Sequence, residues 1–192
     1  MGTTNYILHI KNMVCPRCHY VVEDLLKGLG YTVKAVDLGQ AVISSQNDPD
    51  WQKINEALNK HGLGILRSKI EQEAERIKVL LIHLFYYQNY PVKSDSIATY
   101  LELAMRRNIK ELDKVFQSVN DLSIVDYTNK LRFERAKELV SYDEQPLEDI
   151  ANRLGYENAD RLGNEFKKKL NISIHEFSMR ADFHRKSLNK LI

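Results

Sequence analysis

The hydrophobic pattern of the chain changes once, near Arg67, and this change constrains the fold more than any other feature of the sequence. Before Arg67, runs with the two-residue period of strands alternate with runs of helical spacing. After Arg67 the strand pattern stops, and apolar residues recur every three or four positions. The 192-residue chain is therefore predicted to be α+β, with a mixed domain over 1–67 and an all-helical domain over 68–192. No Gly/Ser-rich linker separates them, and the helical domain begins with a lead-in helix over 68–90.

The mixed domain is predicted to follow the order β-α-β-β-α-β. Alternating residues over 6–11 predict a first strand, and helical spacing over 21–29 predicts a first helix. β-branched runs on both sides of Gly39 predict a hairpin. Asp50 is placed to cap a second helix, and residues 63–66 predict a last short strand. This order is typical of the ferredoxin-like fold.

The helical domain is predicted to hold two pairs of short helices, one on each side of a longer helix over 124–142. The first pair begins near Ser94 and turns over 105–108, whereas the second begins at Pro146 and turns at Gly155. Proline is tolerated at a helix start, and glycine accepts the positive φ that a tight turn requires. This spacing predicts two helix-turn-helix units, although an ordinary helical bundle would share it. The residues expected to face inward are Ile97, Ala98, Leu101, Leu103, Ile109, Leu112, Val115, Phe116, Leu147, Ile150, Ala151, Leu154, Leu162 and Phe166.

Several residues of the helical domain stand in the order and spacing of a known family signature. They are Arg132-x-x-Arg135-Ala136-x-x-Leu139-Val140, Ile150-Ala151-x-x-x-Gly155-Tyr156, Phe166-Lys167-Lys168 and Ile172-Ser173-x-x-x-Phe177. Over about residues 75–180 the chain resembles the C-terminal domain of AraC/XylS transcription regulators. It departs from the family at Leu162 (usually Phe), Asn171 (usually Gly) and Ile174 (usually Pro). The resemblance implies a transcription regulator that binds double-stranded DNA.

In that family the second helix of each unit enters the major groove. The candidate DNA-binding residues are Arg106, Arg107, Lys110 and Lys114 in the first unit, and Asn158, Arg161, Asn164, Lys167 and Lys168 in the second. An arginine can bond guanine through two hydrogen bonds, and Asn164 can do the same with adenine. Lys167 and Lys168 are candidates for phosphate contacts or for a merely solvated face. Arg135, inside the longer helix, is equally suited to an internal ion pair and to a DNA contact.

The overall composition excludes several classes. The net charge of +2 means that any nucleic-acid surface must be local. Only two cysteines are present, three positions apart, so a disulfide framework is excluded and a reducing, cytoplasmic location is expected. No apolar stretch is long enough to span a membrane. The sequence has no Ser/His/Asp arrangement or phosphate-binding glycine loop, so we expect no enzymatic activity.

The two cysteines belong to the segment Met13-Val14-Cys15-Pro16-Arg17-Cys18, between the first predicted strand and helix. Free N–H groups at a helix start stabilise thiolates and lower their pKa. Two such thiolates favour one soft d¹⁰ ion, namely Cu(I), with Ag(I) or Hg(II) as mimics. Zn(II) prefers four ligands, and a third could come only from a residue such as His19 or His61. Met13 is expected to anchor the loop in the core rather than to bind metal.

The Met-x-Cys-x-x-Cys loop and the β-α-β-β-α-β order resemble the heavy-metal-associated domain of copper chaperones over about residues 5–66. Asn12 replaces the glycine usual before the methionine. The resemblance implies that Cys15 and Cys18 bind a soft metal ion, and that the chain is a metal-responsive regulator. Three alternatives stay open: a thioredoxin-like redox pair, a domain that now only dimerises or binds a small molecule, and a metal chaperone with a helical appendage. A second copy of the chain is also a candidate partner, through the N-terminal domain.

Overall fold

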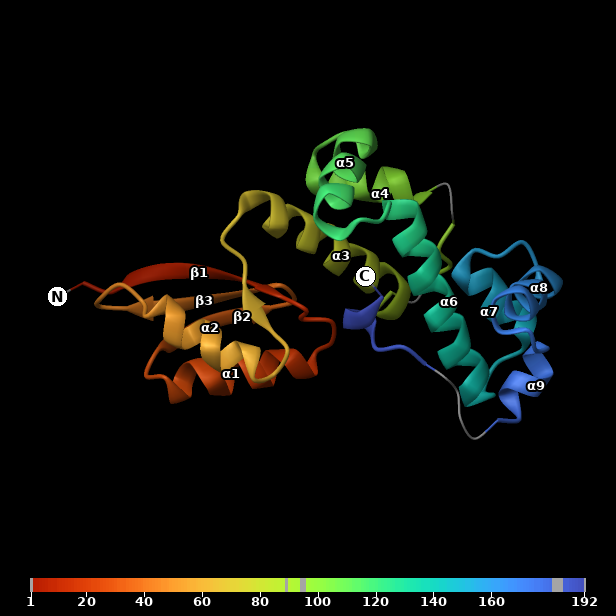
Figure 1. Ribbon diagram of the computed structural model, residues 1–192, viewed down its shortest axis with the longest axis horizontal. Helices are drawn as coiled ribbons and strands as arrows, with labels where there is room; N and C mark the ends of the chain where they lie inside the picture. The colour runs from red at the N-terminus through yellow and green to blue at the C-terminus, as the bar shows by residue number, and fades with distance from the viewer. Residues whose placement is uncertain (1, 89, 94–95, 181–184, 192) are drawn as a thin grey trace. The chain divides into compact units, whose positions relative to one another are not determined.

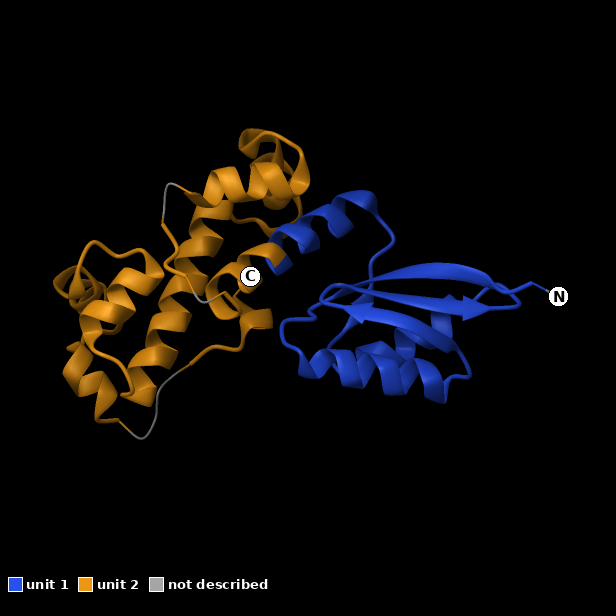
Figure 2. Ribbon diagram, turned by 180° about the vertical axis from the view of Figure 1, so that it is seen from behind, with its two compact units in different colours: residues 1–79 blue, residues 80–192 orange. Residues whose placement is uncertain are grey.

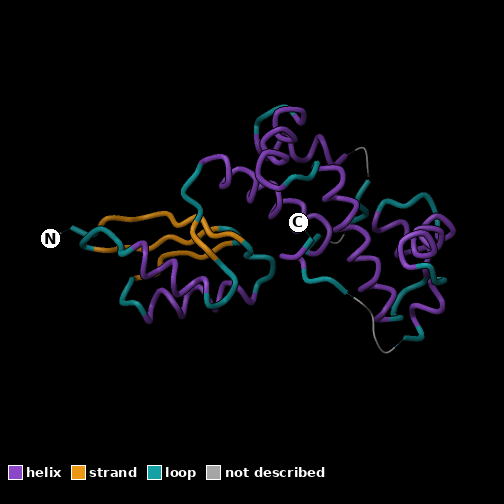
Figure 3. The backbone as a smooth tube through the Cα atoms, in the orientation of Figure 1, coloured by secondary structure: helices purple, strands orange, loops and turns teal. Residues whose placement is uncertain are grey.

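The computed structural model describes residues 2–88, 90–93, 96–180 and 185–191, and it divides into two compact units. The first unit is Met1–Val79 and the second is Leu80–Ile192 (Figure 2). Among the described residues, strands occur only in the first unit, which confirms the α+β class (Figure 3). The predicted division after residue 67 marks the end of strand structure, whereas packing divides the chain inside helix α3 (Lys69–Tyr86). No described helix is long and apolar enough to cross a membrane.

The first unit contains a four-stranded antiparallel sheet in the order β2-β3-β1-β4, and helices α1 and α2 lie on one side of it (Figure 1). Its elements are β1 (Thr4–Lys11), α1 (Arg17–Gly28), β2 (Thr32–Asp37), β3 (Gln40–Ser45), α2 (Trp51–Asn59) and β4 (Gly64–Ile65). The last strand has two residues, shorter than the 63–66 predicted. Asp50 caps α2 as expected, because its carboxylate accepts the N–H of Lys53 at 3.0 Å.

The core of the first unit follows the alternation of the strands. Leu8 and Ile10 on β1 are fully buried, whereas Ile7 between them is 59% exposed. Because successive side chains on a strand point to opposite faces, one face of the sheet packs against the two helices. The remaining core residues are Met13, Val22, Leu26, Ala41, Ile43, Ile54, Leu58 and Leu63.

The second unit is helical and is organised around the long helix α6 (Figure 1). Its helices after α3 are α4 (Ser96–Met105), α5 (Ile109–Asn120), α6 (Ile124–Tyr142), α7 (Leu147–Leu154), α8 (Ala159–Leu170) and α9 (Ile174–Ser178), with a 3₁₀ turn at Leu188–Lys190. Helix α6 packs against α5, α7 and α9. The bounds of α6 are those predicted from the sequence.

The second unit repeats one structural pattern at an interval of 50 residues. Helices α5 and α8 have 12 residues each and begin at Ile109 and Ala159. Four pairs of matching positions have the same role in both. Asn108 and Asn158 cap the two helices, and Leu112 and Leu162 are fully buried in them. Asp121 and Asn171 end the helices in the left-handed region, and Ser123 and Ser173 cap the helices that follow. The two helix-turn-helix units are thus versions of one motif.

Some residues that were expected to face inward do not, and one predicted helix cap lies outside the described residues. Leu103 was expected to face inward, but it is 75% exposed. It follows the buried Leu101 by two positions, which is about 200° around an α-helix, so it lies on the opposite face. Val115 is only half-buried. Leu147 was also expected to face inward, but it is 37% exposed because it stands at the first position of α7. The predicted cap Ser94 lies outside the described residues.

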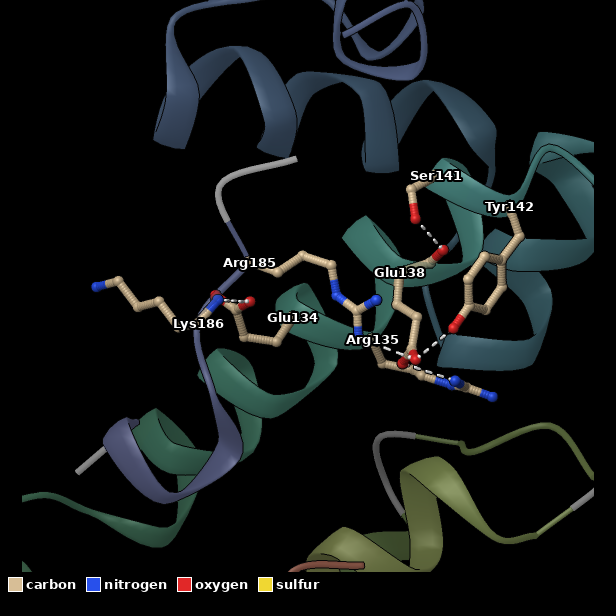
Figure 4. A network of polar contacts seen from close by, with 7 residues as sticks. All are labelled: Glu134, Arg135, Glu138, Ser141, Tyr142, Arg185 and Lys186. Atoms are coloured by element: carbon tan, nitrogen blue, oxygen red, sulfur yellow. Dashed lines mark hydrogen bonds and ion pairs between the residues drawn. The ribbon is translucent and has the colours of Figure 1, made fainter. Parts of the chain in front are cut away.

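A network of ion pairs joins α6 to the segment at 185–191 (Figure 4). The carboxylate of Glu138 accepts hydrogen bonds from Arg135 at 2.7 Å and Tyr142 at 2.9 Å, and it pairs with Arg185 at 2.9 Å. Burial acts to raise the pKa of Glu138, but these donors outweigh it and hold the pKa below its usual range. The side chain of Glu138 therefore stays ionised within a largely buried network.

A second carboxylate on α6 fixes the same segment. Glu134 accepts the backbone N–H of Lys186 at 2.9 Å (Figure 4). It also pairs with Lys137 at 2.7 Å. Lys130 donates to the carbonyl of Leu191 at 3.1 Å, and Leu191 is buried. The segment 185–191 is thus held along α6 through both backbone and side-chain contacts.

We expect Phe166→Ala to lower the free energy of unfolding of the helical unit by about 3–5 kcal/mol, the usual cost of removing a buried aromatic side chain. The Phe166 ring is fully buried, with its centroid 5.0 Å from that of Phe133 and 5.1 Å from that of Phe177. Urea unfolding followed by far-ultraviolet circular dichroism measures the change. As a control, Leu103→Ala should change stability by less than about 0.5 kcal/mol. Equal losses in the two variants would contradict the assigned packing.

Candidate functional site

Helices α5 and α8 each bury one apolar seam and leave a polar face exposed. The seam of α5 is Leu112 and Phe116, and that of α8 is Leu162 and Phe166; all four side chains are fully buried. The predicted DNA-binding residues are all exposed: Arg106, Arg107, Lys110, Lys114, Asn158, Arg161, Asn164, Lys167 and Lys168. The sequence-predicted residues therefore lie on the exposed faces of two equivalent helices or in the turns that lead into them.

The side chains at the start of α5 differ in how far they are already engaged. Arg106 lies in the turn before the helix, in the left-handed region with φ 53°. Arg107 pairs with Glu111 through its Nε at 3.2 Å, so its guanidinium is partly held. Lys110 and Lys114 have no ion-pair partner among the described residues. These two lysines are the cations of α5 most available to an external anion.

The start of α8 carries a similar arrangement with different residues. The amide oxygen of Asn158 accepts the N–H of Arg161 at 2.9 Å, so Asn158 serves as a helix cap. Glu165 pairs with Lys169 at 2.6 Å. Within the described part of the chain, the guanidinium of Arg161 has no such partner. Arg161 is thus exposed and uncommitted in the first turn of α8.

A polar cavity of about 370 Å³ runs along one side of α8. It is lined by Arg132, Gly155, Tyr156, Glu157, Arg161, Asn164, Glu165, Lys168 and Lys169. Arg132 comes from α6, where it donates to Asn129 at 2.5 Å and its guanidinium lies 4.9 Å from the centre of the Tyr156 ring. Arg132 was not among the residues predicted for this surface. Its position in the family signature gave no signal of which helix it would face.

Arg135 is an internal ion-pair partner. Its guanidinium bonds Glu138 at 2.7 Å and lies 5.0 Å from the centre of the Tyr86 ring. Its side chain is only 13% exposed. Of the two roles considered for Arg135, the structure therefore supports the structural one.

The two cysteines lie in the loop between β1 and α1. The sulfur atoms of Cys15 and Cys18 are 3.6 Å apart, and the Cys18 N–H donates to the Cys15 carbonyl at 3.0 Å. Both side chains are half-buried and both thiols are free. Met13 is fully buried in the core, as expected of a residue that anchors the loop. The two sulfurs can thus reach one ion.

The donor set around these sulfurs is limited to the two thiols. Among the described residues, no histidine, aspartate, glutamate or further cysteine joins the two thiols to form a group of three that could hold a metal ion. His19 and His61, considered as a third ligand, do not complete such a group. Two thiols without further donors fit an ion that accepts two sulfur ligands better than one that requires four.

The ionisation of Cys18 differs from the sequence expectation of a lowered thiol pKa. Burial raises the pKa of Cys18, and the backbone N–H contacts that lower it do not compensate. The neighbouring Cys15 thiol adds to the increase. A helix start alone therefore does not decide the ionisation of this thiol.

Asn12 begins the loop in the left-handed region, with φ 67°. Glycine or asparagine adopts this conformation at the least cost, which explains why asparagine can stand where the resemblance leads one to expect glycine. Two bonds hold the residue: its side chain donates to the Gly62 carbonyl at 3.0 Å, and its backbone N–H donates to Glu75 at 2.7 Å. Sequence reasoning missed Glu75, because 63 residues separate it from Asn12.

Comparison with known proteins gives matches in the helical part of the chain. Residues 103–180 match the family model described as a helix-turn-helix domain. The chain is also similar to the HTH-type transcriptional activator RhaS from Escherichia coli O1:K1 / APEC, strain HS and strain K12 / DH10B. Each is 26% identical over 117 residues, which cover 61% of this chain and 41% of the relative.

The chain thus spans less than half the length of these relatives. No solved structure gave a significant match. The matched region contains the end of α4 and all of α5, α6, α7, α8 and α9. Residues 103–180 therefore match a helix-turn-helix domain.

Proposed function

We propose that this chain is a sequence-specific DNA-binding transcription regulator. The observation that carries the proposal is the 50-residue repeat, which presents two equivalent helices with exposed Arg, Lys and Asn side chains. Second helices of helix-turn-helix units read base edges in the major groove. The relatives are named transcriptional activators, which supports the same class of function here.

The length of α6 suits two reading helices on one face of DNA. Its 19 residues extend about 28 Å at 1.5 Å per residue. Successive major grooves on one face of B-DNA are about 34 Å apart. A rigid helix of this length can hold the two units at a separation of that order. The ion pairs of Glu134 and Glu138 contribute to that rigidity.

We assign direct contact with a base to Arg161. It lies in the first turn of α8, where recognition helices contact bases, and its guanidinium is uncommitted. Asn164 lies one turn further along the same exposed face and suits adenine. Lys168 lines the same cavity and suits phosphate. Base reading and backbone contact would thus come from neighbouring positions on one helix.

Arg161→Lys tests the assignment because it keeps the charge and removes the two parallel hydrogen bonds to guanine. We expect roughly 5- to 150-fold weaker binding to the preferred sequence, with non-specific binding nearly unchanged. A preferred sequence is first selected with the wild-type chain from random duplexes, and affinities are then measured by fluorescence anisotropy. Lys168→Gln is the contrasting variant: it should weaken binding to all sequences and reduce the slope of log K against log salt by about 1. A chain that selects no sequence and shows no salt dependence would not be a regulator of this kind.

We further propose that the N-terminal unit is a heavy-metal-associated, ferredoxin-like domain in which Cys15 and Cys18 hold a soft metal ion, Cu(I) in the first place. The β-α-β-β-α-β order, the strand order β2-β3-β1-β4 and the two sulfurs at 3.6 Å support this proposal. Ag(I) and Hg(II) suit the same pair of thiols, whereas Zn(II) would need donors from elsewhere, for instance from a second copy of the chain. Metal would change the affinity for DNA only by as much as the affinity for metal differs between the DNA-binding and the non-binding state of the chain.

Titration of the reduced chain with Cu(I), in competition with a chelator, tests the metal site. We expect tight binding with one ion per chain or one per two chains, and its loss in the Cys15→Ser, Cys18→Ser double variant, because thiolates are the ligands. The control is DNA binding by the double variant without metal, which should stay at the wild-type level. Wild-type binding no tighter than that of the double variant would refute the metal site. It would then favour a thiol redox pair or a domain that senses something else.

A further inference from the structure

The loop that carries the two thiols is bonded directly to helix α3. The backbone N–H of Asn12, three positions before Cys15, donates to Oε1 of Glu75 at 2.7 Å. Glu75 belongs to the first half of α3, within the same compact unit as the loop. This bond joins residues that are distant in sequence, and the proposed metal-binding function does not require it.

The carboxylate that accepts this bond is buried and charged. The second oxygen of Glu75 lies 2.7 Å from Nζ of Lys78, and the two side chains are only 8% and 9% exposed. Removing charged groups from water is unfavourable, and such pairs are often no more stable than apolar residues of similar size. The contribution of the Glu75 pair is therefore to fix position: the carboxylate faces the start of the thiol loop and holds it in one place.

Helix α3 continues past Val79 into the second unit without a break. Glu75 lies in its first half and accepts a hydrogen bond from Asn12 of the thiol loop. On the loop side, Asn12 has two attachments, to Glu75 and to the carbonyl of Gly62. A change in the loop at Asn12 thus acts on α3 through one short hydrogen bond.

We propose that Glu75 is the positioning residue through which occupation of the thiol loop is transmitted to α3. The proposal rests on metal binding by Cys15 and Cys18. Ion binding fixes the loop, and the Asn12–Glu75 bond passes the change to a helix that the helical unit shares. The same bond, by reciprocity, makes metal affinity depend on the state of α3.

The test uses paired substitutions, because removing one partner of a buried ion pair leaves the other charge unpaired. Glu75→Leu with Lys78→Met removes both charges and the acceptor for Asn12. Glu75→Gln with Lys78→Met also removes both charges but keeps a side-chain carbonyl that can accept the Asn12 N–H. Lys69→Met with Glu71→Gln makes matched changes at exposed positions of the same helix and is the control.

Hydrogen exchange of the full chain, with and without Cu(I) from a chelator buffer, is read over 12–18 and over α3. In the wild-type chain and the control, we expect Cu(I) to slow exchange several-fold in both segments. The variant with Glu75→Leu and Lys78→Met should keep the Cu(I) response over 12–18 and lose the response in α3. The variant with Glu75→Gln and Lys78→Met should recover most of the response in α3. Unchanged exchange in β1 of each variant without metal shows that the first unit is folded.

Two results would overturn the proposal while leaving metal binding intact. One is an α3 response in the Leu/Met variant equal to that of the wild-type chain. The other is a wild-type response over 12–18 with none in α3. Absence of any response over 12–18 in the wild-type chain would instead refute metal binding itself, and the transmission through Glu75 with it.

Discussion

Burial of helix α6 on more than one side is the constraint on which the helical unit depends. Ten of its 19 residues are buried, and they are distributed around the helix rather than along one stripe. A helix buried in this way cannot place all its charged residues in water, so they must be paired. Glu134 and Lys137 pair with each other, and Glu138 accepts bonds from Arg135, Tyr142 and Arg185. Glu134 and Glu138, which pair with the cations of α6, also hold the segment at 185–191.

This arrangement explains why the two helix-turn-helix units have such different surfaces on so similar a frame. The buried aromatic positions repeat closely: Phe116 and Phe166 are both fully buried, and the buried Tyr127 and Phe177 follow them at the same interval. The exposed positions do not repeat, since Glu111 corresponds to Arg161 and Lys114 to Asn164. Burial in the core constrains the first set of residues alone. The second set is free to differ, as two reading helices for different bases would require.

The sequence predicted the features that depend on local chemistry. The bounds of α6, the cap at Asp50 and the turn at Gly155 were all predicted, because each follows from residues within a few positions. Leu103 was assigned to the wrong face, since hydrophobicity alone does not distinguish a core residue from an exposed one. The bond from Asn12 to Glu75 and the role of Arg132 could not be predicted, because they join elements whose contact depends on the whole fold. The 50-residue repeat was present in the sequence but is visible mainly in caps and helix ends.

Two positions where the sequence resemblances lead one to expect glycine have one physical feature in common. Asn12 and Asn171 stand at these positions, and both adopt the left-handed conformation, with φ 67° and φ 57°. Asparagine tolerates this region better than most residues, so the backbone at each position is retained. The difference lies in what the side chain adds. Glycine at position 12 would keep the turn but could not donate to the Gly62 carbonyl. Asparagine there gives the thiol loop a second attachment, and it makes Asn12 the point at which β1, the turn after α2 and helix α3 meet.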